Sequence, residues 1–369
     1  MVGEIRIRLP GSPGIPFTRR FVFKPALDPE PRNSMATMKA VRVHRFGGPE
    51  VLSLDDVPMP QPRDDEVTLK VCAASVNPVD CKTREGSVGG DLPVTLGRDV
   101  SGVVELCGTR AHTLKKGDPM FAMLGNDRGG NAEYVVVKAT EAAAKPGRLS
   151  HVEAAAVPLA GVTAWQGLFD HGDLKPAQRV LIHGGAGGVG HLAIQFAKVA
   201  GAFVVTTVAA EDFDFVRELG ADQAVDYKNQ RFEDEVEDID MVFDLVAGDT
   251  QDRSWSVLKP GGILVSTVSE PSPEQARLHQ ARGVSYLAEP NAALLARISR
   301  LIDAGKVTPF VQATYPLERS PRLRNGWRAS TRAARSCFRW PPEPGCSKFP
   351  GNIQVKSEPI LRTSHADGR

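Results

Sequence analysis

The chain has 369 residues, which is enough for two domains of ordinary size. Its 45 basic and 44 acidic residues leave a formal net charge of +1, so the charge does not favour nucleic acid as a partner. No apolar run approaches the roughly 18 residues that cross a membrane, so we expect a protein without a membrane span. Five cysteines are scattered without the spacing of a disulfide framework, which favours a reducing compartment, the cytoplasm.

Residues 1–34 differ in character from the chain that follows. They hold five arginines and several prolines but no helical or strand period. An Arg-rich start is typical of a transit peptide, yet the prolines and the acids Glu4, Asp28 and Glu30 interrupt a basic amphipathic helix. We therefore expect a disordered leader or an over-extended start of translation.

From Met38 the sequence predicts short strands separated by glycine and proline. β-branched residues alternate along each segment, a pattern that favours half-buried strands and a compact β-rich domain. The predicted strands are Lys39–Val43, Val51–Asp56, Glu66–Ala73, Val100–Cys107, Pro119–Ala122 and Ala132–Val137.

The pattern turns helical over Leu159–Asp170, and from Arg179 strands alternate with helical stretches. This order predicts an α/β protein, in which a β-rich domain is followed by a doubly wound parallel sheet. The later predicted strands are Ala202–Val208, Gln223–Asp226, Met241–Leu245 and Gly262–Val268.

A glycine-rich turn joins the first parallel strand to its helix. Arg179–His183 is an apolar run suited to a buried strand, and an apolar helix is expected from His191 onward. The spacing Gly185-x-Gly187-x-x-Gly190 fits the dinucleotide fingerprint in its required context. Glycines let a pyrophosphate approach the backbone, and the N–H groups that open the helix hold its charge. The alternative is an ordinary tight turn.

Eight blocks of sequence follow one another in an order shared with a known family. They are MKAVRVHRFGGPEVL, ASVNPVDCKTREG, LPVTLGRDVSGVV, GGNAEYVVV, EAAAVPLAGVTAWQGL, HGGAGGVG, LGADQAVDY and LKPGGILVS. Over about residues 38–319, the chain resembles the zinc-independent quinone oxidoreductases of the medium-chain dehydrogenase/reductase superfamily. The resemblance implies a GroES-like substrate domain over 38–160, to which 300–319 returns, and a Rossmann domain over 161–299.

The resemblance also implies a site without metal. In zinc-using relatives, a Cys, a Gly-His-Glu triplet and a later Cys bind the catalytic metal. Here Asn77 stands in place of the first Cys, and Gly97-Arg98-Asp99 replaces the triplet. A guanidinium has no lone pair to offer a metal, so Arg98 cannot be a ligand. Cys72 is interpreted as a buried small residue, as is Cys81.

Without a Lewis acid, we expect the chemistry to rest on the cofactor, whose hydride goes to a quinone or an α,β-unsaturated carbonyl. The resemblance places Asn77 toward the nicotinamide and the acceptor, where an amide donates and accepts hydrogen bonds without changing charge. The alternative is that Asn77-Pro78 is only a turn.

The resemblance assigns the cofactor to the glycine turn and to the carboxyl ends of the parallel strands. Thr163 matches a threonine near the nicotinamide ribose, and Tyr227 matches a tyrosine beside the adenosine, although a helix cap and core packing are the respective alternatives. The predicted cofactor-binding residues are Thr163, Gly185, Gly187, Gly188, Val189, Gly190, Tyr227, Val246, Ser266 and Val268.

The choice of cofactor depends on the residues after the second parallel strand. An NAD site places an acid about 20 residues beyond the glycines, whereas residues 206–210 have none, which leaves room for a 2′-phosphate. Glu211 and Asp212 would repel that phosphate, while Lys228 could pair with it. NADPH is favoured over NADH.

The match to the family ends after Ser320. An amphipathic helix is still predicted over Pro290–Gly305, and Lys306–Arg319 matches the family's next strand. Relatives end near Arg-Gly-Lys-Ile-Val-Leu, whereas this chain continues SPRLRNGWRASTRAARSCFRW. With suitable synonymous codons, the neighbouring reading frame gives AEAQKRLASEHTRGKIVLPV, the family's ending. We therefore expect residues 320–369 to be out of frame and largely disordered, with a strand of the first domain lost; the alternative is a divergent basic tail.

Three functions are compatible with these observations. The first is an NAD(P)H-dependent, zinc-independent oxidoreductase that reduces quinones or enones. The second is a nucleotide-binding protein without turnover, and the third is a frameshifted product of such an enzyme with impaired folding. The resemblance also implies a homodimer, joined along the sheet edge near Gly262–Val268.

Overall fold

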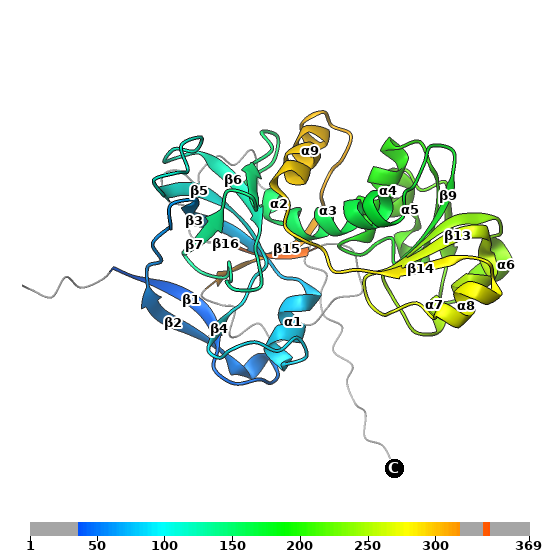
Figure 1. Ribbon diagram of the computed structural model, residues 1–369, viewed down its shortest axis with the longest axis horizontal. Helices are drawn as coiled ribbons and strands as arrows, with labels where there is room; N and C mark the ends of the chain where they lie inside the picture. Colours follow the sequence, from blue (N-terminus) through cyan, green and yellow to red (C-terminus); the bar gives the residue numbers. More distant parts are fainter. Residues whose placement is uncertain (1–35, 318–334, 340–369) are drawn as a thin grey trace, which may run out of the picture. The chain divides into compact units, whose positions relative to one another are not determined.

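The computed structural model describes residues 36–317 and the backbone of residues 335–339 (Figure 1). The expected leader at residues 1–34 lies outside the described residues, and so does the expected out-of-frame tail apart from 335–339. Within the described part, no helix is both long and apolar enough to cross a membrane.

Two sheets of short strands form the first domain, as the alternating pattern predicted, and the late segments 311–316 and 335–339 add two strands to one of them. Helix α1 (Pro78–Glu85) begins two residues after strand β3 (Glu66–Ser75). It ends at Gly86, whose φ of 88° is the left-handed conformation that glycine adopts at little cost. The smaller sheet has the order β2-β1-β4, from Leu52–Pro58, Thr37–Val43 and Val94–Thr95. The larger has the order β15-β16-β3-β5-β6-β8, with β7 beside β3, from Val311–Pro316, Arg335–Arg339, Glu66–Ser75, Asp99–Cys107, Pro119–Met123 and Ala142–Ala144, with Tyr134–Lys138 as β7.

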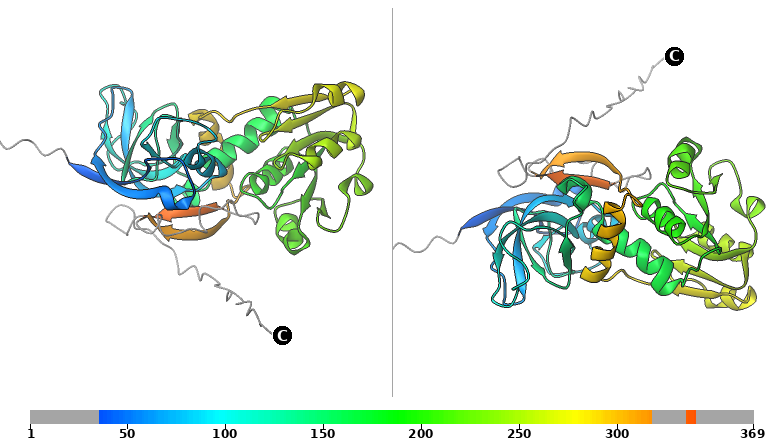
Figure 2. Two further views of the ribbon diagram at one scale, coloured as in Figure 1. Left: turned by 90° about the horizontal axis from the view of Figure 1, so that it is seen from below. Right: turned by 90° about the horizontal axis from the view of Figure 1, so that it is seen from above.

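The expectation that the first domain loses a strand is wrong. β16 pairs in parallel with β15 and antiparallel with β3, where Cys337 lies opposite Ser75. The strands β15 and β16 lie side by side in both views of Figure 2. Such pairing uses backbone N–H and C=O groups, which almost every residue carries, so a strand forms there without an alternating apolar pattern.

The second part of the chain is a six-stranded parallel sheet, which confirms the doubly wound Rossmann fold. Its order is β11-β10-β9-β12-β13-β14, so the chain reverses direction across the sheet between β9 and β12. Open α/β sheets bind ligands at the carboxyl ends of their strands beside this reversal. The strands are Arg179–His183 (β9), Phe203–Val208 (β10), Gln223–Asp226 (β11), Ile239–Asp244 (β12), Leu258–Ser266 (β13) and Arg282–Ser285 (β14).

Both faces of this sheet are covered, which explains the uninterrupted apolar run of β9. Val180 and Ile182 pack with Phe196 in one hydrophobic cluster, whereas Leu181 between them packs with Trp255 in another. Successive strand residues thus point into opposite faces, and each face needs an apolar side chain. The helices are α2 (His151–Ala155), α3 (Pro158–Trp165), α4 (Gly190–Val199), α5 (Phe213–Glu218), α6 (Phe232–Glu235), α7 (Asp249–Ser254), α8 (Pro273–Leu278) and α9 (Ala292–Asp303), with a π-helical turn η2 (Gln166–His171) after α3.

The amphipathic helix expected over Pro290–Gly305 is confirmed as α9, which returns toward the first domain. Its buried face includes Leu295 and Ile298, and the hydroxyl of Ser299 donates to the carbonyl of Ala144 in β8, 3.2 Å away. β15 then follows at Val311, within the segment that matched the family's strand.

The expected dimer edge near Gly262–Val268 is wrong. β13 lies between β12 and β14, with both of its sides paired. Among the described strands, β14 and β11 are the edges of this sheet. Strand order is set by the crossover helices and not by the sequence of a single strand, so an apolar run alone did not distinguish a central strand from an edge.

The cysteines of the described part are not all alike. Cys81 and Cys107 are not disulfide-bonded, and burial raises the pKa of the Cys81 thiol to about 11. Cys72 is buried as expected, but it is disulfide-bonded. The interpretation of Cys72 as a buried residue is confirmed, and the disulfide is a feature that the sequence did not predict.

Candidate functional site

The glycine turn between β9 and α4 contains glycines with different structural roles. A Cβ at Gly190 would lie 2.2 Å from the carbonyl oxygen of Gly184, and one at Gly185 would lie 2.0 Å from the hydroxyl of Thr206. Both positions therefore require glycine for packing. A Cβ at Gly187 would have one close neighbour, the Gly184 oxygen at 3.1 Å. The fold alone places a weaker demand on Gly187, which leaves its backbone open to a ligand.

Exposed apolar side chains follow three of the parallel strands at their carboxyl ends. Tyr227 after β11 is 56% exposed, Val246 after β12 is 50% exposed, and Val268 after β13 is 43% exposed. All three had been predicted from the sequence as cofactor-binding residues. They lie at the carboxyl ends of the strands, the end of the sheet that also carries the glycine turn, where a bound ligand would cover them.

Buried hydrogen bonds of Ser266 hold the chain in place at this end of the sheet. Ser266 is fully buried, and its hydroxyl donates to Oδ2 of Asp244 over 2.8 Å while accepting from the backbone N–H of Val268. Asp244 in turn accepts from the backbone N–H groups of Val246 and Ala247 through Oδ1. The sequence analysis did not select Asp244. A polar residue that ends the apolar strand Met-Val-Phe-Asp was the available signal.

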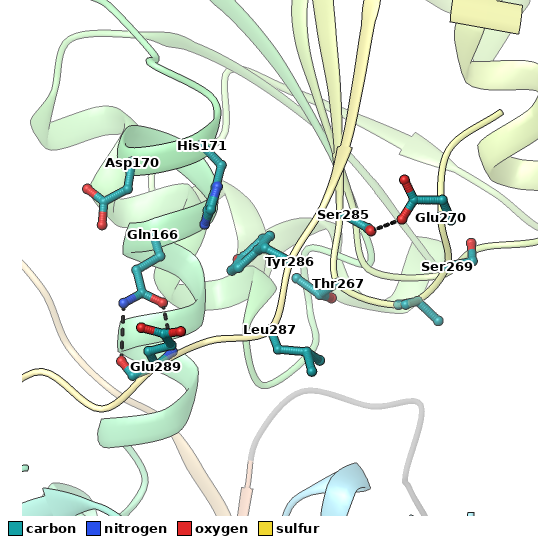
Figure 3. A pocket seen from close by; sticks show the side chains of 11 residues that line it. Gln166, Asp170, His171, Thr267, Ser269, Glu270, Ser285, Tyr286, Leu287 and Glu289 are labelled. Atoms are coloured by element: carbon teal, nitrogen blue, oxygen red, sulfur yellow. Dashed lines mark hydrogen bonds between the residues drawn. The ribbon is translucent and has the colours of Figure 1, made fainter. Parts of the chain in front are cut away.

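A pocket of about 750 Å³ opens beside the ends of β13 and β14 (Figure 3). Gln166 in η2 exchanges two hydrogen bonds with the backbone of Glu289, each 3.1 Å long. The ring of Tyr286 stacks on His171 with centroids 4.4 Å apart, and its hydroxyl donates to the carbonyl of Thr163. These contacts fix the segment after β14 against the α3–η2 helix.

Thr163 is buried, and its hydroxyl donates to the carbonyl of Leu159 over 2.6 Å. The hydroxyl hydrogen is therefore used within α3, and the oxygen can only accept from a ligand.

An ion pair stands at the other end of the predicted cofactor site, after β10 and β11. Nζ of Lys228 lies 2.8 Å from Oε1 of Glu211, and both side chains are exposed. The hydrogen bond to Glu211 raises the pKa of Lys228. Glu211 was expected to repel a 2′-phosphate and Lys228 to attract it, and the two side chains are direct partners.

Asn77 is only 2% exposed, and its amide is already engaged. Its Nδ2 donates to Oγ of Ser75 over 3.1 Å and to Oδ2 of Asp99 over 2.9 Å. Asn77 also forms a reciprocal capping box with Asp80 at the start of α1. The sequence left a simple turn as the alternative to a catalytic role, and the structure shows Asn77 as the N-cap of α1.

Two buried carboxylates organise the surroundings of Asn77. Burial raises the pKa of Asp80 to about 6, although its carboxylate accepts from the backbone N–H groups of Asn77 and Gly97. Asp99 accepts from Asn77 and also from the backbone N–H of Leu159, 2.6 Å away at the start of α3.

The residues at the metal-ligand positions of zinc-using relatives are hydrogen-bonded to other protein groups, as the bond from Asn77 to Asp99 shows. Arg98 donates through Nε to the carbonyl of Leu124 over 2.9 Å and through Nη1 to Oδ1 of Asn126. In the part of the chain that the structure describes, no three His, Cys, Asp or Glu side chains gather in a metal-binding arrangement.

A β-rich domain followed by a parallel sheet, with a glycine-rich turn between the sheet's first strand and helix, defines a medium-chain dehydrogenase/reductase. The alcohol dehydrogenase GroES-like domain family matches residues 63–147, and the zinc-binding dehydrogenase family matches 219–322. The chain belongs to the quinone oxidoreductase family of this superfamily, as the relatives described next show.

Over 292 residues, the chain is 35% identical to an NADPH-dependent alkenal/one oxidoreductase of Arabidopsis thaliana, covering 76% of this chain and 73% of that protein. It is 31% identical to the human quinone oxidoreductase over 301 residues, with 76% and 91% covered. The quinone oxidoreductase structure from Coxiella burnetii is 34% identical with a TM-score of 0.77, covering 82% of this chain and 99% of that one.

Proposed function

We propose that the protein is an NADPH-dependent oxidoreductase that transfers hydride to a quinone or an α,β-unsaturated carbonyl compound. The observation that carries the proposal is the open backbone at Gly187, on the same sheet edge as three exposed apolar side chains. The names of relatives, an NADPH-dependent alkenal/one oxidoreductase and a quinone oxidoreductase, support this substrate class.

The residues present fit a pyridine dinucleotide. The turn at Gly187 and the first N–H groups of the ten-residue helix α4 would hold the pyrophosphate. Tyr227 would pack against the adenosine, while Thr163 and Val268 would contact the nicotinamide half. The bound cofactor supplies the hydride, and these residues supply position and exclude water.

We infer a preference for NADPH from Lys228. Its pairing with Glu211 lies on the exposed surface, so a phosphate can replace the carboxylate at low cost. The opposing effect is repulsion between that phosphate and Glu211. NADPH binding therefore requires Glu211 to turn away from Lys228, and the net preference over NADH is modest.

We also infer a homodimer, now joined through β14. This strand is an edge of the parallel sheet, and Arg282 and Gly283 within it are exposed. A second copy could pair with its free backbone groups and extend the sheet. Light scattering at micromolar concentration should give twice the chain mass, and a monomeric mass would reject this arrangement.

Turnover distinguishes the proposed enzyme from a nucleotide-binding protein without activity. The purified protein is incubated with NADPH and a panel of quinones and enones, and loss of absorbance at the reduced nicotinamide band is followed. Reduction of at least one acceptor, with a product two hydrogens heavier by mass spectrometry, is expected. NADPH binding without turnover of any acceptor would favour the non-catalytic alternative.

A further inference from the structure

A buried histidine contacts the turn that the proposed function assigns to the pyrophosphate. His191 is the second residue of α4 and is fully buried, and its Nδ1 lies 3.0 Å from the carbonyl oxygen of Gly187. The backbone N–H of His191 donates to the same oxygen over 3.1 Å. One residue therefore holds this carbonyl twice, although His191 is not among the residues predicted to bind the cofactor.

The second nitrogen of the His191 ring determines where its hydrogen lies. Nε2 lies 3.3 Å from the backbone nitrogen of Phe310. A backbone N–H can only donate, so Nε2 accepts and carries no hydrogen. The ring is then neutral with its hydrogen on Nδ1, which donates to the carbonyl of Gly187. The partners on both sides of the ring thus agree on one tautomer.

The segment that supplies the N–H of Phe310 is itself held on α4. The side-chain amide of Gln195 donates through Nε2 to the carbonyl of Thr308 over 3.0 Å and accepts through Oε1 from the N–H of Thr308 over 2.8 Å. This segment joins α9 to β15, so it leads from the Rossmann domain into the larger sheet of the first domain. The connection between the two domains therefore fixes the orientation of the His191 ring.

The bond to the carbonyl of Gly187 also orients the N–H of Gly188. The two groups belong to one trans peptide unit, in which C=O and N–H point in opposite directions. The carbonyl is turned toward the buried imidazole, so the N–H is turned away from it. Gly188 is partly exposed, and among the described residues no acceptor pairs with its N–H. Donors of this kind bind phosphate at the start of a helix.

We propose that His191 is a positioning residue for cofactor binding, whose Nδ1–H orients the Gly187–Gly188 peptide so that the N–H of Gly188 meets the pyrophosphate. This inference rests on the proposed function, since it needs a dinucleotide in the turn. His191 acts through the backbone. It strengthens binding because the donor is already oriented when the ligand arrives.

The same helix shows which side chain can replace the imidazole. Nε2 of Gln195 donates over 2.9 Å to the carbonyl of His191, four residues earlier. A glutamine at position 191 can reach the carbonyl of Gly187 in the same way, and its Oε1 can accept the N–H of Phe310. His191→Gln therefore keeps the proposed hydrogen bond, whereas His191→Leu removes it.

The test is a calorimetric titration of each variant with NADPH, accompanied by thermal unfolding. His191→Leu should raise the dissociation constant about tenfold, the effect of losing one hydrogen bond, and His191→Gln should restore it to within about threefold of the wild type. Gln195→Leu is the matched control, because it releases Thr308 on the same helix but leaves both ring bonds of His191 in place. It should lower the melting temperature and leave NADPH affinity within about twofold of the wild type.

A second readout uses the wild-type protein labelled with nitrogen-15 at histidine. The His191 ring, assigned by its absence from either His191 variant, should show the Nδ1–H tautomer in the NMR spectrum. An Nε2–H tautomer, unchanged NADPH affinity in folded His191→Leu, or an equal loss of affinity in His191→Gln or Gln195→Leu would each overturn the proposal while NADPH binding by the wild type upholds the dinucleotide site. A wild-type protein that does not bind NADPH would refute the proposed function, and this inference with it.

Discussion

Valine in place of Gly187 should weaken dinucleotide binding while leaving the fold intact. The new Cβ meets one atom closely, the Gly184 oxygen at 3.1 Å, and a shift of a few tenths of an ångström relieves that contact. A pyrophosphate in the turn, however, would meet the added methyl groups and lose at least one charge-assisted hydrogen bond. Such a bond contributes about 1.5–3 kcal/mol, so the dissociation constant for NADPH should rise about 10- to 100-fold.

The measurement is a calorimetric titration with NADPH, accompanied by thermal unfolding of the free protein. Gly190→Val is the matched control, because its Cβ would lie 2.2 Å from one backbone atom and 2.7 Å from another, so the fold itself should fail. Gly187→Val should keep its melting temperature and lose affinity, whereas Gly190→Val should lose both. Unchanged NADPH affinity in folded Gly187→Val would refute the reasoning.

Three further outcomes are expected. Glu211→Gln should free its lysine partner and lower the dissociation constant for NADPH several-fold relative to NADH; an unchanged ratio in parallel titrations would contradict this. Burial lowers the pKa of His151 and His183 to about 4, so the unfolded chain takes up their protons first and the free energy of unfolding should fall as the pH drops from about 6.5 to 4. The pKa of Asp80 is raised to about 6, so its protonation stabilises the folded protein and offsets the effect of only one of the two histidines. Urea denaturation in which the free energy of unfolding does not fall over this pH range would count against buried neutral histidines. Restoring the alternative reading frame places Ile-Val-Leu over residues 335–338, where β16 lies, and should raise the melting temperature; resequencing that confirms the present frame, with a protease-resistant core through β16, would reject the frameshift.

Much of the fold was predictable because its signals are local. The alternation of the first-domain strands and the strand–glycine–helix order around Gly187 depend on neighbouring residues only. β14 was missed because four residues, one of them Gly283, carry too little periodicity. β16 was missed because its backbone partners, β3 and β15, are supplied by distant parts of the chain.

The candidate site was predictable at its surface and less so in its interior. Tyr227, Val246 and Val268 are exposed at the expected sheet edge, as the family pattern implied. The side chains of Asn77 and Ser266 donate hydrogen bonds to carboxylates that come from other strands, so no local sequence pattern predicts these bonds. The family match identifies a position, whereas the hydrogen-bond partners of its side chain come only from the packed structure.

The carboxylate of Asp99 connects the start of α1 to the start of α3. One oxygen holds Asn77, at the start of α1, and the other holds the first turn of α3 through Leu159. The same helix continues into η2, where Gln166 secures the segment after β14. A continuous series of contacts thus runs from Asn77 through Asp99, α3 and η2 to the segment after β14. A substitution at Asp99 is therefore expected to disturb both ends of this series together.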